Sequence, residues 1–158
     1  MPGPSLNRVV KDFTAPATSD TEVHMKALRG KQVVIYFYPK DNTPGCTNES
    51  KDFTALHARF KRANTEIFGV SRESLTSHEK FKAKFDMPFE LISDGDEALC
   101  RYFDVIKEKN MYGKKVMGIE RSTFLIDADG KLREEWRKVK VAGHAEAVLE
   151  AAKALAKG

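Results

Sequence analysis

Cys46 is the residue whose surroundings in the sequence most favour chemistry. It follows the turn Thr43-Pro-Gly45 and opens a segment, residues 46–63, in which apolar or bulky side chains recur at helical spacing. A thiol in the first turn of a helix faces unpaired backbone N–H groups and the positive end of the helix dipole, and both favour the thiolate. Because only the thiolate is a competent nucleophile, the position predicts a thiol used for exchange, metal binding or oxidation.

The stretch before Cys46 should hold this thiol in place. Val33-Val-Ile-Tyr-Phe-Tyr38 is an unbroken run of β-branched and aromatic residues, which is typical of a strand buried on both faces. We therefore expect a central strand over residues 32–38. Pro39 cannot donate a hydrogen bond to a sheet and ends the strand, and the helix that begins at Cys46 should run to about Arg62.

The chain after this first strand and helix continues the alternation. It predicts a strand over residues 66–71, a helix over 74–85 and a strand over 89–93. Ser74 is a plausible N-cap of the second helix, whose inward positions would be Leu75, Phe81 and Phe85. An alternating order of strands and helices favours parallel pairing in the middle of the sheet.

The remaining segments complete one α/β domain over residues 1–158. We expect an N-terminal arm over 1–12, a hairpin of 13–18 with 22–26, a helix over 98–106, a loop over 107–119, a second hairpin of 122–126 with 132–136, and a helix over 145–156. The loop is long enough to lie over a site. The pattern predicts a thioredoxin-like fold with an N-terminal extension and a mixed central sheet flanked by helices.

Charge and composition narrow the functional classes. The net charge is +4, but 27 basic residues are well mixed with 23 acidic ones, which favours ordinary solvated surfaces over nucleic-acid binding. The four histidines and two cysteines have no zinc-type spacing, and there is no glycine-rich phosphate loop. We therefore expect no metal, no bound cofactor and no nucleic-acid partner.

The two cysteines and the apolar runs indicate in which cellular compartment the protein works. Two cysteines in 158 residues argue against a disulfide-rich secreted protein, and no run approaches the roughly 20 apolar residues of a membrane span. We expect a cytoplasmic protein without a membrane segment.

Cys100, next to Leu99 and three residues before Phe103, is better explained as a thiol packed beside a core stripe than as a nucleophile.

The residues around Cys46 resemble a known family. Pro39-x-x-x-Thr43-x-x-Cys46 matches the peroxiredoxin signature, and the run from Tyr38 to Glu49 is similar to the peroxiredoxin Q, or bacterioferritin comigratory protein, subfamily. Three further blocks in the same order extend the resemblance over most of the chain: Phe68-Gly-Val-Ser71, Leu91-Ile-Ser-Asp94 and Arg121-Ser-Thr-Phe-Leu-Ile-Asp127.

The resemblance implies a thiol-dependent peroxidase acting on hydrogen peroxide and organic hydroperoxides. Cys46 would be the nucleophile that becomes a sulfenic acid, and Thr43 would hydrogen-bond to the sulfur and the peroxide. Pro39 would shield the sulfur. Arg121 would favour the thiolate and bind peroxide, and Glu49, one helical turn after Cys46, would orient Arg121. Each also has a simpler interpretation: Thr43 as a turn residue, Pro39 as a strand terminator, Arg121 as a surface cation and Glu49 as a carboxylate favoured by the helix dipole.

The sequence departs from the subfamily where a second, resolving cysteine usually stands. The position five residues after Cys46 is Lys51, and the segment 81–84 in the following helix also lacks cysteine. Cys100 is the remaining candidate, but a disulfide requires Cα atoms within about 7 Å of each other. We therefore favour a one-cysteine cycle, in which thioredoxin or glutathione with glutaredoxin reduces the sulfenic acid.

Other functions remain open at this point. The same thiol would suit a peroxide sensor that passes oxidation to a partner, and the same fold would suit a holdase chaperone or a basic binding module. Met111, Tyr112 and Met117 either wall an apolar pocket for organic hydroperoxides or belong to a surface loop. Subfamily resemblance implies a monomer or weak dimer.

Overall fold

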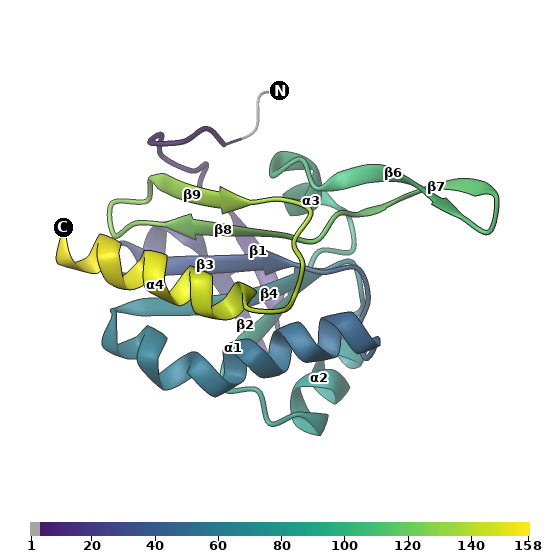
Figure 1. Ribbon diagram of the computed structural model, residues 1–158, viewed down its shortest axis with the longest axis horizontal. Coiled ribbons are helices and arrows are strands. Elements are labelled where there is room, and N and C mark those ends of the chain that lie inside the picture. The colour runs from purple at the N-terminus through teal and green to yellow at the C-terminus, as the bar shows by residue number, and fades with distance from the viewer. Residues whose placement is uncertain (1–3) are drawn as a thin grey trace.

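The sheet at the centre of the protein is built around the apolar strand that precedes Cys46. The structure is a computed structural model that describes residues 4–158 apart from the side chain of Met111; part of the expected N-terminal arm, residues 1–3, lies outside this range. Seven strands form one sheet in the order β2-β1-β5-β4-β3-β8-β9 (Figure 1). All six residues of β3 (Gln32–Phe37) are buried, as its composition predicted.

The pairing of β3 makes the sheet mixed. It runs parallel to β4 (Thr65–Ser71) and antiparallel to β8 (Ser122–Ile126). On one side β4 continues in parallel to β5 (Glu90–Ser93), and on the other β8 forms the predicted antiparallel hairpin with β9 (Leu132–Trp136). The prediction of parallel pairing in the middle of the sheet is therefore confirmed. Antiparallel pairing was expected towards one edge, but it occurs at the other edge as well, where the N-terminal hairpin joins β5.

The N-terminal extension also joins this sheet. β1 (Thr14–Ala17) and β2 (Thr21–His24) form the predicted hairpin, and β1 pairs with β5 to become part of the sheet. A 3-10 turn, η1 (Met25–Leu28), leads back towards β3. The segment before β1 makes one bridge, Val9 with Lys131, at the β9 end of the molecule.

Alternate residues of β3 face two different cores. Val34, Tyr36 and Tyr38 pack with residues of α1 (Pro44–Arg62), α2 (Leu75–Lys84) and α4 (His144–Lys157). Val33, Ile35 and Phe37 pack on the opposite face, against the N-terminal segments and the short α3 (Ala98–Tyr102). The sheet therefore separates two hydrophobic clusters, as expected for a strand covered on both faces.

The segment expected to be a loop over 107–119 is instead a two-stranded ribbon. β6 (Ile106–Met111) and β7 (Lys114–Ile119) pair antiparallel outside the main sheet and project from the body of the molecule (Figure 1). Their turn is Tyr112-Gly113, and both residues have positive φ (54° and 80°), which is typical of a tight hairpin. The first four residues of β7 are exposed, so the ribbon has no core-facing pattern by which it could be predicted.

Two smaller predictions also need correction. The helix expected over 98–106 ends at Tyr102, because Asp104 adopts a left-handed conformation (φ 56°) and Ile106 begins β6. In α2 the N-cap Ser74 accepts a hydrogen bond from the Ser77 amide as predicted, but Leu75 is 38% exposed. Among residues 4–158, no helix is long and apolar enough to cross a membrane.

Candidate active site

Cys46 lies where β3, a short turn and α1 meet. The strand ends at Phe37, the turn runs from Tyr38 to Thr43, and Pro44 occupies the first position of the helix, where its missing N–H costs no hydrogen bond. Cys46 is therefore the third residue of α1, and only 1% of its surface is exposed. The sulfur is held in the first turn, where the backbone N–H groups and the helix dipole favour a thiolate.

Arg121 links the sulfur to a carboxylate from the same helix. It lies between β7 and β8, and its Nη2 atom is 3.4 Å from Cys46 Sγ. Its Nη1 atom donates to Glu49 Oε1 at 2.7 Å. One guanidinium thus contacts two side chains spaced one turn apart on α1, and its permanent charge stabilises a thiolate at Cys46. The predicted proximity of these three residues is confirmed.

The carboxylate of this group is almost fully buried. Glu49 is 1% exposed, and its Oε2 atom has no hydrogen-bond partner among the residues that the structure describes. Burial raises the pKa of Glu49 to about 7, against the opposing effect of Arg121. Burial acts to lower the pKa of Arg121, but Glu49 and Cys46 outweigh it, so that the net shift is upward.

Gly45 leaves room for the guanidinium. A Cβ atom at this position would lie 3.0 Å from Arg121 Nη2 and 3.8 Å from Cζ. The first of these distances is shorter than a normal van der Waals contact. The small residue before the thiol therefore allows Arg121 to approach the start of α1.

Thr43 and Pro39 border the turn, but among the described residues neither makes a hydrogen bond to the sulfur. Thr43 is the N-cap residue by position, yet its hydroxyl donates to the Lys40 carbonyl at 2.9 Å and makes no side-chain cap. Pro39 is half-buried and follows the end of β3, as expected for a residue that cannot pair in the sheet.

Cys100 lies in the other core. It is fully buried on the α3 face of the sheet, whereas Cys46 belongs to the cluster on the α1 face. Burial, and then the hydrogen bond and charge of Asp94, raise the pKa of the Cys100 thiol far above its ordinary value. Its backbone N–H donates to Asp94 Oδ2 at 2.7 Å. The interpretation of Cys100 as a packed core thiol is confirmed, and both cysteines are free.

Two features near the site were missed from the sequence. Asp41, in the turn, makes a buried hydrogen bond with His78 of α2, and the two are 37 residues apart. Lys109 of the ribbon donates to the Ile119 carbonyl beside the site; burial, followed by the charge of Arg121, lowers its pKa. The only sequence signal for His78 was its position three residues before Phe81, on the same face of the helix.

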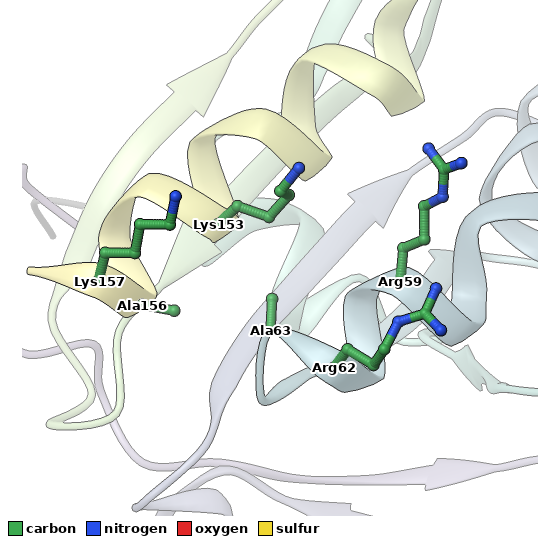
Figure 2. A pocket seen from close by; sticks show the side chains of 6 residues that line it. All are labelled: Arg59, Arg62, Ala63, Lys153, Ala156 and Lys157. Atoms are coloured by element: carbon green, nitrogen blue, oxygen red, sulfur yellow. The ribbon is translucent and has the colours of Figure 1, made fainter.

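One groove on the surface lies away from this site. A hollow of about 390 Å³ lies between the C-terminal ends of α1 and α4 (Figure 2). Its lining consists of four cationic and two alanine side chains: Arg59, Arg62, Ala63, Lys153, Ala156 and Lys157. Basic residues in the last turns complement the negative ends of the helix dipoles, which accounts for them without a ligand.

Comparison with known proteins agrees with the fold. Residues 6–135 match the AhpC/TSA family. The chain is 59% identical to the peroxiredoxin Bcp of Xanthomonas campestris over 92% of this chain and 91% of that one. A structure from a study of the alkyl peroxide reduction activity of the Xanthomonas campestris bacterioferritin comigratory protein superposes with a TM-score of 0.87 at 58% identity, covering 91% of this chain and 92% of the other.

A second solved structure covers nearly the whole chain. The PrxQ of Xylella fastidiosa, in a mutant form, superposes with a TM-score of 0.92 at 42% identity over 98% of both chains. The predicted thioredoxin-like fold is confirmed by these neighbours. On the combined evidence of family match, identity and structure, the chain belongs to the AhpC/TSA family and, within it, to the peroxiredoxin Q (Bcp) group of thiol-dependent peroxidases.

Proposed function

We propose that this protein reduces hydroperoxides at Cys46. The contact of Arg121 Nη2 with the sulfur, at 3.4 Å, is the observation that supports this most directly, because it places a permanent positive charge at the reacting atom. The same guanidinium is held by Glu49 at 2.7 Å, so its orientation is fixed before substrate arrives. This arrangement suits a reaction in which negative charge moves from sulfur onto oxygen.

The chemical step is a displacement at oxygen. The Cys46 thiolate attacks one oxygen of ROOH, the O–O bond breaks, and the second oxygen leaves with its electron pair and takes up a proton as ROH or water. The sulfur is oxidised to sulfenic acid, and the peroxide is reduced. Arg121 would stabilise the charge that develops on the oxygens. Glu49 would hold the guanidinium of Arg121 in place during this step.

Thr43 and Pro39 would act on the substrate side of the turn. The Thr43 hydroxyl uses its hydrogen for the Lys40 carbonyl, which leaves its two lone pairs free to accept a hydrogen bond from the peroxide O–H. Pro39 is half-buried and offers no N–H that would compete for the substrate oxygens. These roles complete the set of five site residues that the sequence suggested.

Regeneration by an external thiol follows from the residues near Cys46. Lys51 stands where many subfamily members carry the resolving cysteine, and the thiol of Cys100 is buried and neutral in the opposite core. The sulfenic acid would react with one thiol to give a mixed disulfide and water, and a second thiol would release Cys46. Thioredoxin, or glutathione with glutaredoxin, in a reducing cytoplasm would supply these thiols to a monomer or weak dimer.

The substrate class includes organic hydroperoxides. Alkyl peroxide reduction is named for the Xanthomonas campestris relative, and it is the basis for extending this class to the present chain. The ribbon residues considered as pocket walls do not help to define it. Tyr112 is fully exposed and Met117 is 57% exposed, so these two side chains lie on the surface.

Peroxide consumption by the wild type and by Cys46→Ser tests the proposal. We expect activity with a thiol donor in the wild type and none in Cys46→Ser; equal activity in both would refute a role for Cys46. One equivalent of peroxide without reductant should add one oxygen atom to the intact mass, whereas loss of two hydrogens would indicate a disulfide within the chain. Cys100→Ser should then turn over at a nearly unchanged rate.

A further inference from the structure

Asp41 is the one buried residue between Pro39 and Thr43 in the active-site turn. Its neighbours Lys40 and Asn42 are exposed, whereas the Asp41 side chain is only 4% exposed. Its Oδ1 atom accepts a hydrogen bond from the Tyr38 hydroxyl at 2.6 Å, and its Oδ2 atom accepts from Ser77 Oγ at 2.7 Å. The carboxylate therefore joins the end of β3 to the first turns of α2.

His78 completes the group and is fully buried. Its Nδ1 atom lies 2.7 Å from Asp41 Oδ2, and its Nε2 atom lies 3.0 Å from the Ile92 carbonyl oxygen. Both ring nitrogens therefore have a hydrogen-bond partner. Burial acts to raise the pKa of Asp41, but the hydrogen bonds and charge of its partners outweigh this and lower it, so the carboxylate is ionised.

A buried polar group of this kind is a poor source of stability. Removing a charge from water costs several kcal/mol, and apolar replacements of similar shape are often equally stable. What such a group provides is a fixed geometry, because each oxygen and each ring nitrogen has a partner. The geometry fixed here is that of the turn between Tyr38 and Thr43, which ends three residues before Cys46.

We propose that the Asp41, His78, Tyr38 and Ser77 group is a positioning device for the peroxide-binding turn. Its hydrogen bonds join the turn to α2 and β5, and this fixes the positions of Pro39 and Thr43 relative to the sulfur. None of the four residues makes a hydrogen bond to the sulfur in the described structure, so they act through the turn and are positioning residues. The inference rests on the proposed function, since it assigns the turn a part in binding peroxide.

Two rate constants measured on Cys46 separate positioning from general stability. Oxidation by peroxide requires the turn, whereas alkylation by iodoacetamide requires only an accessible thiolate. In Asp41→Ala we expect oxidation to slow roughly 10- to 100-fold, the loss that accompanies a misplacement of about 1 Å. Alkylation should not slow. Asp41→Asn should recover much of the loss, because an amide can still accept from Tyr38 and donate to a neutral imidazole.

A buried polar residue away from the turn provides the matched control. Gln32, at the other end of β3, donates to Thr65 Oγ1 and to the Ala152 carbonyl, both at 3.0 Å, and its exposed fraction is 4%. Gln32→Leu should lower the melting temperature without changing the ratio of oxidation to alkylation. If Asp41→Ala does not fold, Tyr38→Phe removes one hydrogen bond of the group and should still lower this ratio.

The outcomes distinguish failure of the proposed function from failure of the positioning role. A wild-type protein in which Cys46 does not react with peroxide would overturn the proposed function and this inference with it. A reactive wild type whose ratio of oxidation to alkylation is unchanged in Asp41→Ala, or in Tyr38→Phe if only that variant folds, would overturn the positioning role alone. A lower ratio in either variant, with the Gln32→Leu ratio unchanged, would support it.

Discussion

Gly45→Ala should separate the stability of α1 from the reactivity of Cys46. The added Cβ would lie 3.0 Å from Arg121 Nη2, about 0.4 to 0.8 Å inside an ordinary contact. The guanidinium is the group that must move, because the backbone of Gly45 is held in the first turn of the helix. The same Nη2 atom contacts the sulfur at 3.4 Å, so we expect this contact to lengthen.

The expected effects have opposite signs. At an effective dielectric constant of about 20, lengthening the distance between the guanidinium and a negative sulfur from 3.4 Å to about 4.0 Å removes about 0.7 kcal/mol of attraction, which corresponds to roughly a 3-fold change in reactivity. Alanine is favoured over glycine by up to ~1 kcal/mol in a helix, although less in its first turn. The variant should therefore be as stable as the wild type, or more stable, but less reactive.

The assay follows the rate of Cys46 alkylation, and then of oxidation by peroxide, beside a thermal unfolding curve. Gly95→Ala is the matched control, because a Cβ there meets no atom within 4 Å and the backbone is not left-handed. We expect both rates to fall about 3-fold in Gly45→Ala and neither to fall in Gly95→Ala. Unchanged rates in a folded Gly45→Ala protein would refute the claim that the Arg121 contact controls the sulfur.

Two buried groups near the site should have opposite effects on the pH dependence of stability. Burial raises the pKa of Glu49 to about 7. The protonated side chain therefore contributes its full stability below pH 4.5, its ordinary pKa, and this contribution is lost as the pH rises through 7. The pKa of His144 is lowered to about 4 by burial and then by Arg121, so that stability is lost as the pH falls from 6.5 towards 4. Each effect amounts to at most about 3 kcal/mol, and together they should leave the free energy of unfolding nearly level between pH 4.5 and 6.5. In denaturant titrations Glu49→Gln should lose stability as the pH falls across this range, and His144→Gln should gain it. Two variants with parallel pH profiles would contradict these assignments.

The central strand and the helix that follows it were predictable because their signals are local. The six consecutive apolar and aromatic residues 33–38 indicate burial on both faces without reference to any other segment. The spacing of Cys46 and Glu49 likewise places them on one side of α1 before any tertiary structure is known. Arg121 is 72 residues beyond Glu49, and only the family resemblance connected it to the site.

The ribbon and the Asp41–His78 pair were not predictable for two different physical reasons. β6 and β7 are stabilised by pairing with each other outside the main sheet, so most of their side chains carry no alternating pattern. Asp41 and His78 are polar residues in segments expected to be exposed, and only the packing of α2 against the turn makes them partners. A propensity argument places polar residues outside, and here the fold overrides it.

The positions of the two cysteines bear on how the enzyme could be regenerated. Cys46 packs with Tyr36 and Phe53 on one face of the sheet, and Cys100 packs with Phe37 and Phe103 on the other. A disulfide would require the first turn of α1 to unwind and α3 to leave its core, because side chains cannot meet through a hydrogen-bonded sheet. An external thiol needs only the first of these movements to reach a sulfur that is 1% exposed. These positions support the one-cysteine cycle that we propose, independently of the lysine at position 51.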